Sequence, residues 1–91
     1  MEAVITDAEA LANISANVQR LRGDKSYSQL ARECSTDDWK AYPSTIEHID
    51  KGRHMPGAGL LKRLAEALGV STEDLLAPPP GMARRRVAKA S

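Results

Sequence analysis

YPSTIEHIDKG, residues Tyr42 to Gly52, carries the marks of a short helix with one apolar side. Pro43 suits the first helical position, because the N–H that proline lacks would have no intrahelical partner there. Ile46 and Ile49 are three residues apart and share a face, which we expect to point into a core. Gly52 can adopt the left-handed conformation that ends a helix. The side opposite the isoleucines is then polar and outward.

A longer apolar face follows downstream in the segment AGLLKRLAEALG, residues 58–69. Its apolar residues recur at helical spacing and predict a helix with a broad buried side, made of Leu60, Leu61, Leu64, Ala65 and Leu68. Gly69 is placed to close this helix. The run 71–74, STED, then opens a last turn that carries Leu75 and Leu76.

Two helices are expected before Tyr42. Thr6 and Glu9 have the spacing of a capping box, and the apolar residues of a first helix follow at Leu11, Ile14, Val18 and Leu21. Either Ser26 or Ser28 can cap a short second helix, whose apolar stripe holds Tyr27, Leu30, Ala31 and Cys34. The stretch 35–41, STDDWKA, breaks the periodicity and is expected to be a loop.

Length and composition restrict the class of protein. The 91 residues make one small domain with a modest core, which leaves room for a binding module but hardly for a deep catalytic cleft. Cys34 is the only cysteine, so no internal disulfide can form, and a reducing cytosol suits it. No apolar run is long enough for a membrane span or a signal peptide. We expect a soluble cytoplasmic protein without a membrane partner.

The residue types that carry chemistry do not favour an enzyme. His48 and His54 lack a second pair of ligands at zinc spacing, and no Gly-rich phosphate cradle occurs. Cys34 lies on an apolar stripe, where a cysteine is far more often a core residue than a nucleophile. We therefore expect no catalytic residue, no bound metal and no cofactor.

The net charge of +1 conceals an uneven distribution. Residues 1–76 hold nine Lys/Arg against twelve Asp/Glu, whereas residues 77–91 hold no acid and the four cations Arg84, Arg85, Arg86 and Lys89. We predict one domain over residues 1–77 and a Pro-rich, then basic, flexible tail over residues 78–91. A nucleic acid would meet a locally basic patch on this chain and not a basic protein.

The polar side of the segment 42–52 has the dimensions of a helix that enters a DNA major groove. Short polar side chains such as Ser44 can reach base edges there, and the cations that follow can meet flanking phosphates. A solvated amphipathic helix would show the same pattern, so this feature alone leaves both interpretations open.

From Asn17 to Leu76 the chain resembles the Cro/CI-type helix-turn-helix family, phage repressors and bacterial regulators also called the xenobiotic-response-element family. Five segments in the family's order carry the resemblance: VQRLR, SYSQLA, STIEHIDKG, RHMP and LLKRLAEALGVSTEDLL. It implies an all-α, compact, five-helix, lambda-repressor-like domain that ends before the disordered basic tail. The chain departs from the family at 35–41, where the family has a tight turn. That insertion can place Trp39 as a lid on the core or, with Lys40, against DNA.

The resemblance also implies which residues contact DNA. The base-contacting set would be Tyr42, Pro43, Ser44 and His48. The phosphate-contacting set would be Ser26, Tyr27, Ser28, Gln29, Thr45, Lys51, Arg53 and His54. Asp50 would have a structural role, because the family pairs an acid at this position with an arginine of the first helix, here Arg22 or Arg20.

These expectations define a sequence-specific double-stranded DNA-binding transcription regulator, a repressor that binds an inverted-repeat operator as a homodimer. One recognition helix buries only ~600–1,000 Å² of protein surface, which is small for selective binding, so two copies on neighbouring half-sites are expected. The exposed side of residues 70–76 and the start of the chain, Met1 to Leu11, are candidate dimer surfaces. The alternative is an antitoxin-type interaction module that neutralises a toxin partner and regulates its own operon.

Overall fold

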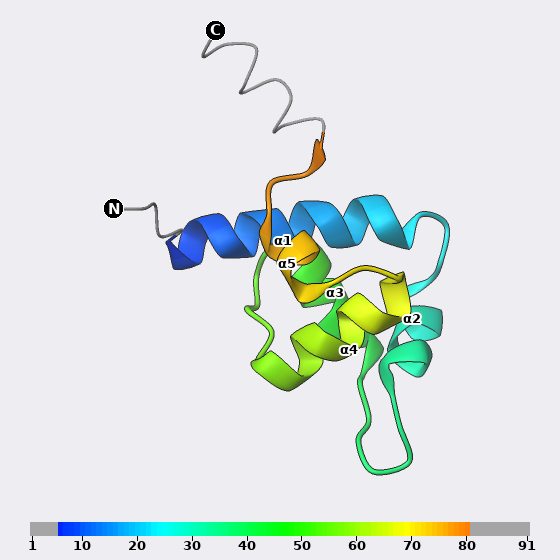
Figure 1. Ribbon diagram of the computed structural model, residues 1–91. Coiled ribbons are helices and arrows are strands. Elements are labelled where there is room, and N and C mark those ends of the chain that lie inside the picture. Colours follow the sequence, from blue (N-terminus) through cyan, green and yellow to red (C-terminus); the bar gives the residue numbers. More distant parts are fainter. Residues whose placement is uncertain (1–5, 81–91) are drawn as a thin grey trace, which may run out of the picture.

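The computed structural model describes residues 6–80, and five α-helices follow one another within them (Figure 1). Their bounds are α1 (Asp7–Arg22), α2 (Tyr27–Cys34), α3 (Pro43–Asp50), α4 (Ala58–Leu68) and α5 (Thr72–Leu76). The one β-type pairing among these residues is an isolated bridge between Thr36 and Trp39. The predicted all-α, five-helix fold is confirmed. The predicted tail falls outside the described residues from position 81 onward, and Pro79, just before that point, is buried.

The helix ends lie where the sequence signals predict them. Thr6 accepts a hydrogen bond from the Glu9 N–H, and the Glu9 carboxylate accepts from the Thr6 N–H, which completes the capping box of α1. Ser26, and not Ser28, is the N-cap of α2. Gly52 and Gly69 end their helices with φ angles of 73° and 77°, a conformation that glycine adopts without steric cost.

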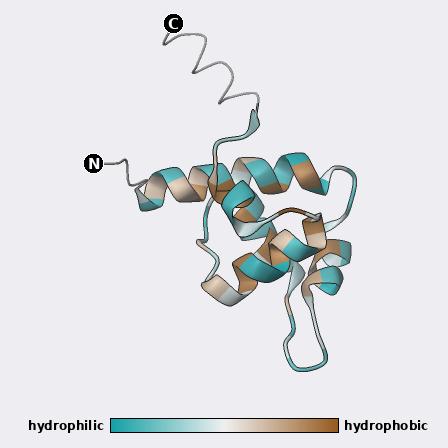
Figure 2. Cartoon of the chain, in the orientation of Figure 1, coloured by the Kyte–Doolittle hydropathy of each residue, from teal (hydrophilic) through white to brown (hydrophobic). Residues whose placement is uncertain are grey.

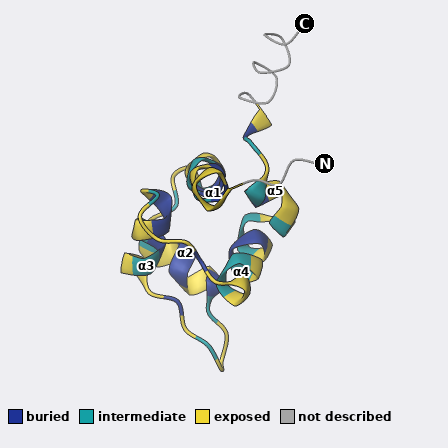
Figure 3. Cartoon of the chain, turned by 90° about the vertical axis from the view of Figure 1, so that its left-hand side faces the viewer, coloured by how far each residue is buried: buried dark blue, intermediate teal, exposed yellow. Residues whose placement is uncertain are grey.

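The core lies where the five helices face one another. Figure 3 shows the buried positions on the inward sides of the helices. The large side chains that are wholly buried come from every helix and include Ile14, Leu30, Ile46, Ile49, Leu64 and Leu75. This core sets the orientation of α3, because its two isoleucines are both fully enclosed.

Two buried asparagines of α1 hold the short helix α5. The Asn17 amide donates to three carbonyl oxygens, those of Asp74 at 3.1 Å, Leu75 at 3.0 Å and Ala77 at 2.7 Å. The Asn13 amide donates to the Leu76 carbonyl at 2.8 Å. The last carbonyls of a helix have no intrahelical partner, so α1 supplies the donors that α5 lacks.

We predict that Asn17→Leu lowers the free energy of unfolding by about 2 kcal/mol, because it keeps the branched shape of the side chain but leaves the carbonyls at the end of α5 without a donor. Urea unfolding followed by circular dichroism measures this. Asn13→Leu, which removes a single bond, is the matched comparison and should cost less. Equal unfolding midpoints for Asn17→Leu and the wild type would contradict the assignment.

Residues 35–41 form a narrow hairpin between α2 and α3, called hairpin 35–41 below. The Thr36 N–H donates to the Trp39 carbonyl at 2.7 Å, and the Trp39 N–H donates back at 3.3 Å. At the base, the Ser35 hydroxyl donates to the Ala31 carbonyl at 2.8 Å and accepts from the Ala41 N–H at 2.9 Å. Figure 1 shows the hairpin projecting from the helices on the side away from α1, and Figure 2 shows it largely hydrophilic to neutral.

Trp39 joins this hairpin to the body of the domain. Its half-buried ring packs against the core, and the Arg63 guanidinium of α4 lies over the ring at 5.1 Å from its centroid. Of the two placements considered for Trp39, the structure therefore shows the lid on the core.

Candidate nucleic-acid interface

The outer flank of α3, which carries Ser44 and His48, faces solvent because of the helical spacing of the residues. Ile46 and Ile49 are fully buried, so residues on the opposite side of the helix face solvent. Ser44 and His48 are four residues apart and both exposed. All four predicted base-contacting residues lie on the exposed surface, and Tyr42 is the most exposed large hydrophobic residue of the described chain, with 60% of its surface accessible.

An ion pair fixes the C-terminal end of α3 to α1. Arg22 Nε lies 3.0 Å from Asp50 Oδ2, and the Asp50 side chain is only 7% exposed. Arg20 instead donates to the Asn17 side-chain oxygen at 2.9 Å. Arg22 is therefore the partner among the two arginines that the sequence allowed, and Asp50 has the expected structural position.

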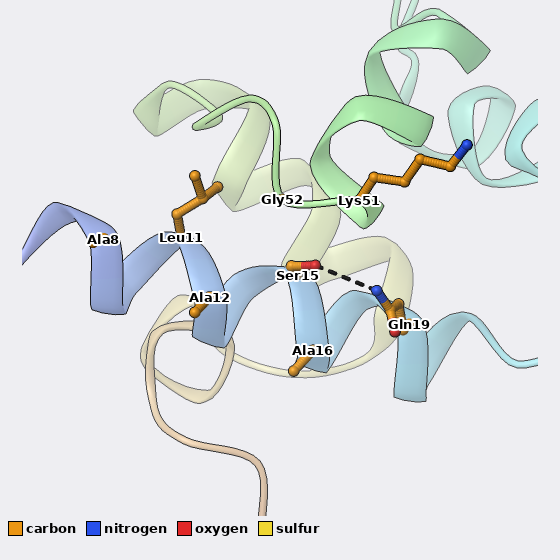
Figure 4. Close-up of a pocket in the computed structure, with 8 residues that line it drawn as sticks. All are labelled: Ala8, Leu11, Ala12, Ser15, Ala16, Gln19, Lys51 and Gly52. Atoms are coloured by element: carbon orange, nitrogen blue, oxygen red, sulfur yellow. Dashed lines mark hydrogen bonds between the residues drawn. The ribbon is translucent and has the colours of Figure 1, made fainter.

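The Asp50 carbonyl adds a second attachment to α1. It accepts from the Ser15 hydroxyl at 2.5 Å and from the Gln19 amide at 2.7 Å. Figure 4 shows Ser15 and Gln19 beside the turn formed by Lys51 and Gly52. A Cβ at Gly52 would lie 3.6 Å from the Ser15 hydroxyl oxygen, so α3 and α1 approach closely at this turn. These contacts tie the C-terminal end of α3 to α1, in addition to the burial of its two isoleucines in the core.

The same turn borders an open groove along α1 with a volume of about 430 Å³ (Figure 4). Half of its eight lining residues are apolar side chains of α1, namely Ala8, Leu11, Ala12 and Ala16. Leu11 belongs to the candidate dimer surface Met1 to Leu11, of which residues 1–5 lie outside the described residues.

The start of α2 presents backbone donors next to α3. The Ser26 hydroxyl accepts from the Gln29 N–H at 3.0 Å. The N–H groups of Tyr27 and Ser28 have no acceptor within residues 6–80. Ser26, Ser28 and Gln29 are exposed, whereas Tyr27 is half-buried under the Arg22 guanidinium, 4.5 Å from its ring centroid. Free N–H groups at a helix N-terminus are suited to a phosphate oxygen.

The predicted phosphate contacts after α3 differ in their surroundings. Arg53 and His54 are exposed, and Thr45 is half-buried. Lys51 Nζ lies 2.7 Å from Glu47 Oε2, and this hydrogen bond raises the pKa of Lys51 and lowers the pKa of Glu47. Since the pair is open to water, Lys51 can exchange the carboxylate for a phosphate at little cost.

Within residues 6–80, the cysteine and the possible metal ligands form no reactive or metal-binding site. Cys34 is 2% exposed, and burial raises the pKa of its thiol to about 11, so its nucleophilic thiolate is scarce at neutral pH. No three His, Cys, Asp or Glu side chains of the described chain are grouped to hold a metal ion. Among the same residues, every helix is too short or too polar to cross a membrane.

A solved structure of another protein has a similar fold. The crystal structure of a hypothetical transcription factor, NHTF, from Neisseria is similar, with a TM-score of 0.67 and 25% sequence identity. The match covers 92% of this chain and 94% of that chain. No protein-family model matches the chain, and no curated protein matches it. The chain therefore shares its fold with a hypothetical transcription factor, while membership of the Cro/CI-type family stays a prediction.

Proposed function

We propose that this chain is a sequence-specific double-stranded DNA-binding regulator of transcription that acts in the cytoplasm, with α3 as its recognition helix. The observation that carries the proposal is the geometry of α3, whose C-terminal end is locked to α1 while Ser44 and His48 stand exposed on the opposite flank. The likeness to a hypothetical transcription factor supports it. The proposal includes no catalytic step and no cofactor.

The four base-contacting residues have distinct chemical roles in this proposal. The His48 imidazole N–H donates to guanine N7 or O6, which makes it the most selective contact. Ser44 donates or accepts and selects weakly by itself. Pro43, together with Tyr42, offers an apolar surface to a thymine methyl.

Phosphate contacts on both sides of the groove would hold α3 in register. The start of α2 supplies the free N–H groups of Tyr27 and Ser28, with the hydroxyl of Ser26 and the amide of Gln29 beside them. On the other side, Lys51, Arg53 and His54 follow the helix. These contacts position the protein and do not depend on base sequence.

The proposed regulator is a homodimeric repressor on an inverted repeat. A single short recognition helix has too small an interface for tight, selective binding, and two half-sites about one helical turn apart double it.

Selection from a random duplex pool tests the proposal. The full chain is incubated with the pool, bound duplexes are amplified, and the cycle is repeated. We expect an inverted repeat to be enriched, which reports specificity, dimer symmetry and spacing together. Failure to enrich any sequence would contradict the proposal and favour a module that binds a protein partner, such as an antitoxin.

A further inference from the structure

An open hollow of about 310 Å³ lies between α2 and hairpin 35–41, beside the proposed recognition helix. It holds basic side chains that are separate from Lys51, Arg53 and His54. Arg32 of α2 and Lys40 of the hairpin line it from two sides. Ser28 lies one turn before Arg32 on the same face of α2 and also lines the hollow. The cationic and hydroxyl groups therefore converge from two separate elements.

Both cations of this hollow are available to a ligand. Within residues 6–80, the side chains of Arg32 and Lys40 form no ion pair and no hydrogen bond, and both residues are exposed. Two other lysines near α2 and α3 are paired with carboxylates, Lys25 with Glu33 and Lys51 with Glu47. The acids of the hairpin, Asp37 and Asp38, do not line the hollow.

Lys40 is held in place by its neighbours in the chain. On one side, Trp39 packs on the core and lies beneath the Arg63 guanidinium. On the other side, the Ala41 N–H is bonded to the Ser35 hydroxyl. Because both flanking residues are fixed, the Lys40 backbone has little freedom to lose when a ligand binds.

The hollow also has the right position for DNA. Its lining includes Ser28, from the proposed phosphate-contacting set, and Pro43, from the proposed base-contacting set. A duplex that receives α3 in its major groove therefore brings one strand's backbone toward the hollow. We propose that Arg32 and Lys40 bind a backbone phosphate of that strand, with the Ser28 hydroxyl as an additional donor, so that hairpin 35–41 is a second DNA-contacting element. This inference rests on the proposed function.

The salt dependence of binding tests the phosphate site. Each phosphate contact contributes about 0.9 to the slope of log K against log salt concentration. The double variant Arg32→Gln/Lys40→Gln should therefore lower the slope by about 1.8 for a dimer that loses one contact per protomer. Binding at 100 mM salt should weaken by roughly tenfold for each lost contact. The loss should be equal for a selected duplex and for a shuffled duplex of the same composition.

Lys62→Gln is the matched control, since Lys62 is also exposed and also forms no ion pair or hydrogen bond within residues 6–80, but lies on α4 and does not line the hollow. It should leave the slope unchanged. Ethylation interference on the selected duplex gives a second measurement, in which the double variant loses one phosphate per half-site whose ethylation weakens binding of the wild type. Thermal unfolding of all variants checks that the domain stays folded.

The outcomes separate the two proposals. If the wild-type chain binds neither duplex, the proposed function is wrong and the phosphate site is wrong with it. If the wild type binds, but the double variant keeps the wild-type slope and interference pattern, only the phosphate site is overturned.

Discussion

Asp50→Ala should lower the free energy of unfolding by about 3 kcal/mol. The carboxylate is almost wholly enclosed, and its removal leaves the Arg22 guanidinium without the charge that offsets its own partial burial. The arginine would keep its bond to the Lys25 carbonyl and its contact with the Tyr27 ring, which holds the loss at the lower end of the range for broken buried pairs. Urea unfolding gives the change directly.

Glu47→Gln is the control for Asp50→Ala, because it breaks an ion pair on the same helix that is open to water. We expect the unfolding midpoint of Glu47→Gln to stay close to that of the wild type. Asp50→Asn should fall between the two, since its amide oxygen can still accept from Arg22 Nε. If Asp50→Ala and Glu47→Gln unfolded at the same midpoint, the Arg22–Asp50 pair would have no part in fixing α3.

Ser44→Ala combined with His48→Ala should remove most of the sequence preference of DNA binding. Each good base contact contributes about 1–3 kcal/mol of discrimination, so the double variant should bind its selected duplex at least roughly 30-fold more weakly. Both residues are exposed, and we expect no change in stability. Fluorescence anisotropy with the selected duplex and a shuffled duplex measures the preference.

His54→Ala is the comparison for that double variant, since it removes the same type of side chain from a position assigned to phosphate. It should weaken binding to the selected and shuffled duplexes by the same factor. An unchanged ratio of affinities in Ser44→Ala/His48→Ala would contradict the role of α3, whatever the effect of His54→Ala.

Signals that act within a few residues are enough to predict the helices of this fold. The capping box at Thr6, the proline at position 43 and the glycines at 52 and 69 each act through backbone groups close in the chain. The spacing of Ile46 and Ile49 likewise predicts which flank of α3 is exposed, because a helix fixes the relation between spacing and face.

Contacts between distant segments are not predictable in the same way. Asn17 bonds to carbonyls 57 to 60 positions away, and nothing near it in the sequence indicates that α5 needs donors from α1. Arg20 and Arg22 point to different sides of α1, so only the packing of α3 and α5 decides which one meets Asp50. The break in periodicity at 35–41 predicts a loop, but not its pairing or the direction in which it projects.

In the candidate site, too, features that depend on nearby residues are predictable, and features that depend on distant segments are not. Exposure of Ser44 and His48 follows from periodicity, whereas Tyr42 and Pro43 are exposed at the N-terminal end of α3, where periodicity does not predict it. The pairing of Lys51 with Glu47 has a four-residue spacing that the sequence displays, but our site prediction does not include it. The predicted site likewise does not include Arg32, which lines the proposed phosphate hollow and lies four residues after Ser28 on one face of α2. The hollow that it shares with Lys40 depends on how the hairpin folds back, which has no signal in the sequence.

The most direct measurement of the central claim repeats the duplex selection with His48→Ala beside the wild type. If the outer flank of α3 contacts base edges, the variant should enrich the same inverted repeat with one base position per half-site no longer fixed, while the other positions and the spacing are kept. Identical enriched sequences from the two proteins, each with every position equally fixed, would contradict the claim that His48 on α3 recognises DNA.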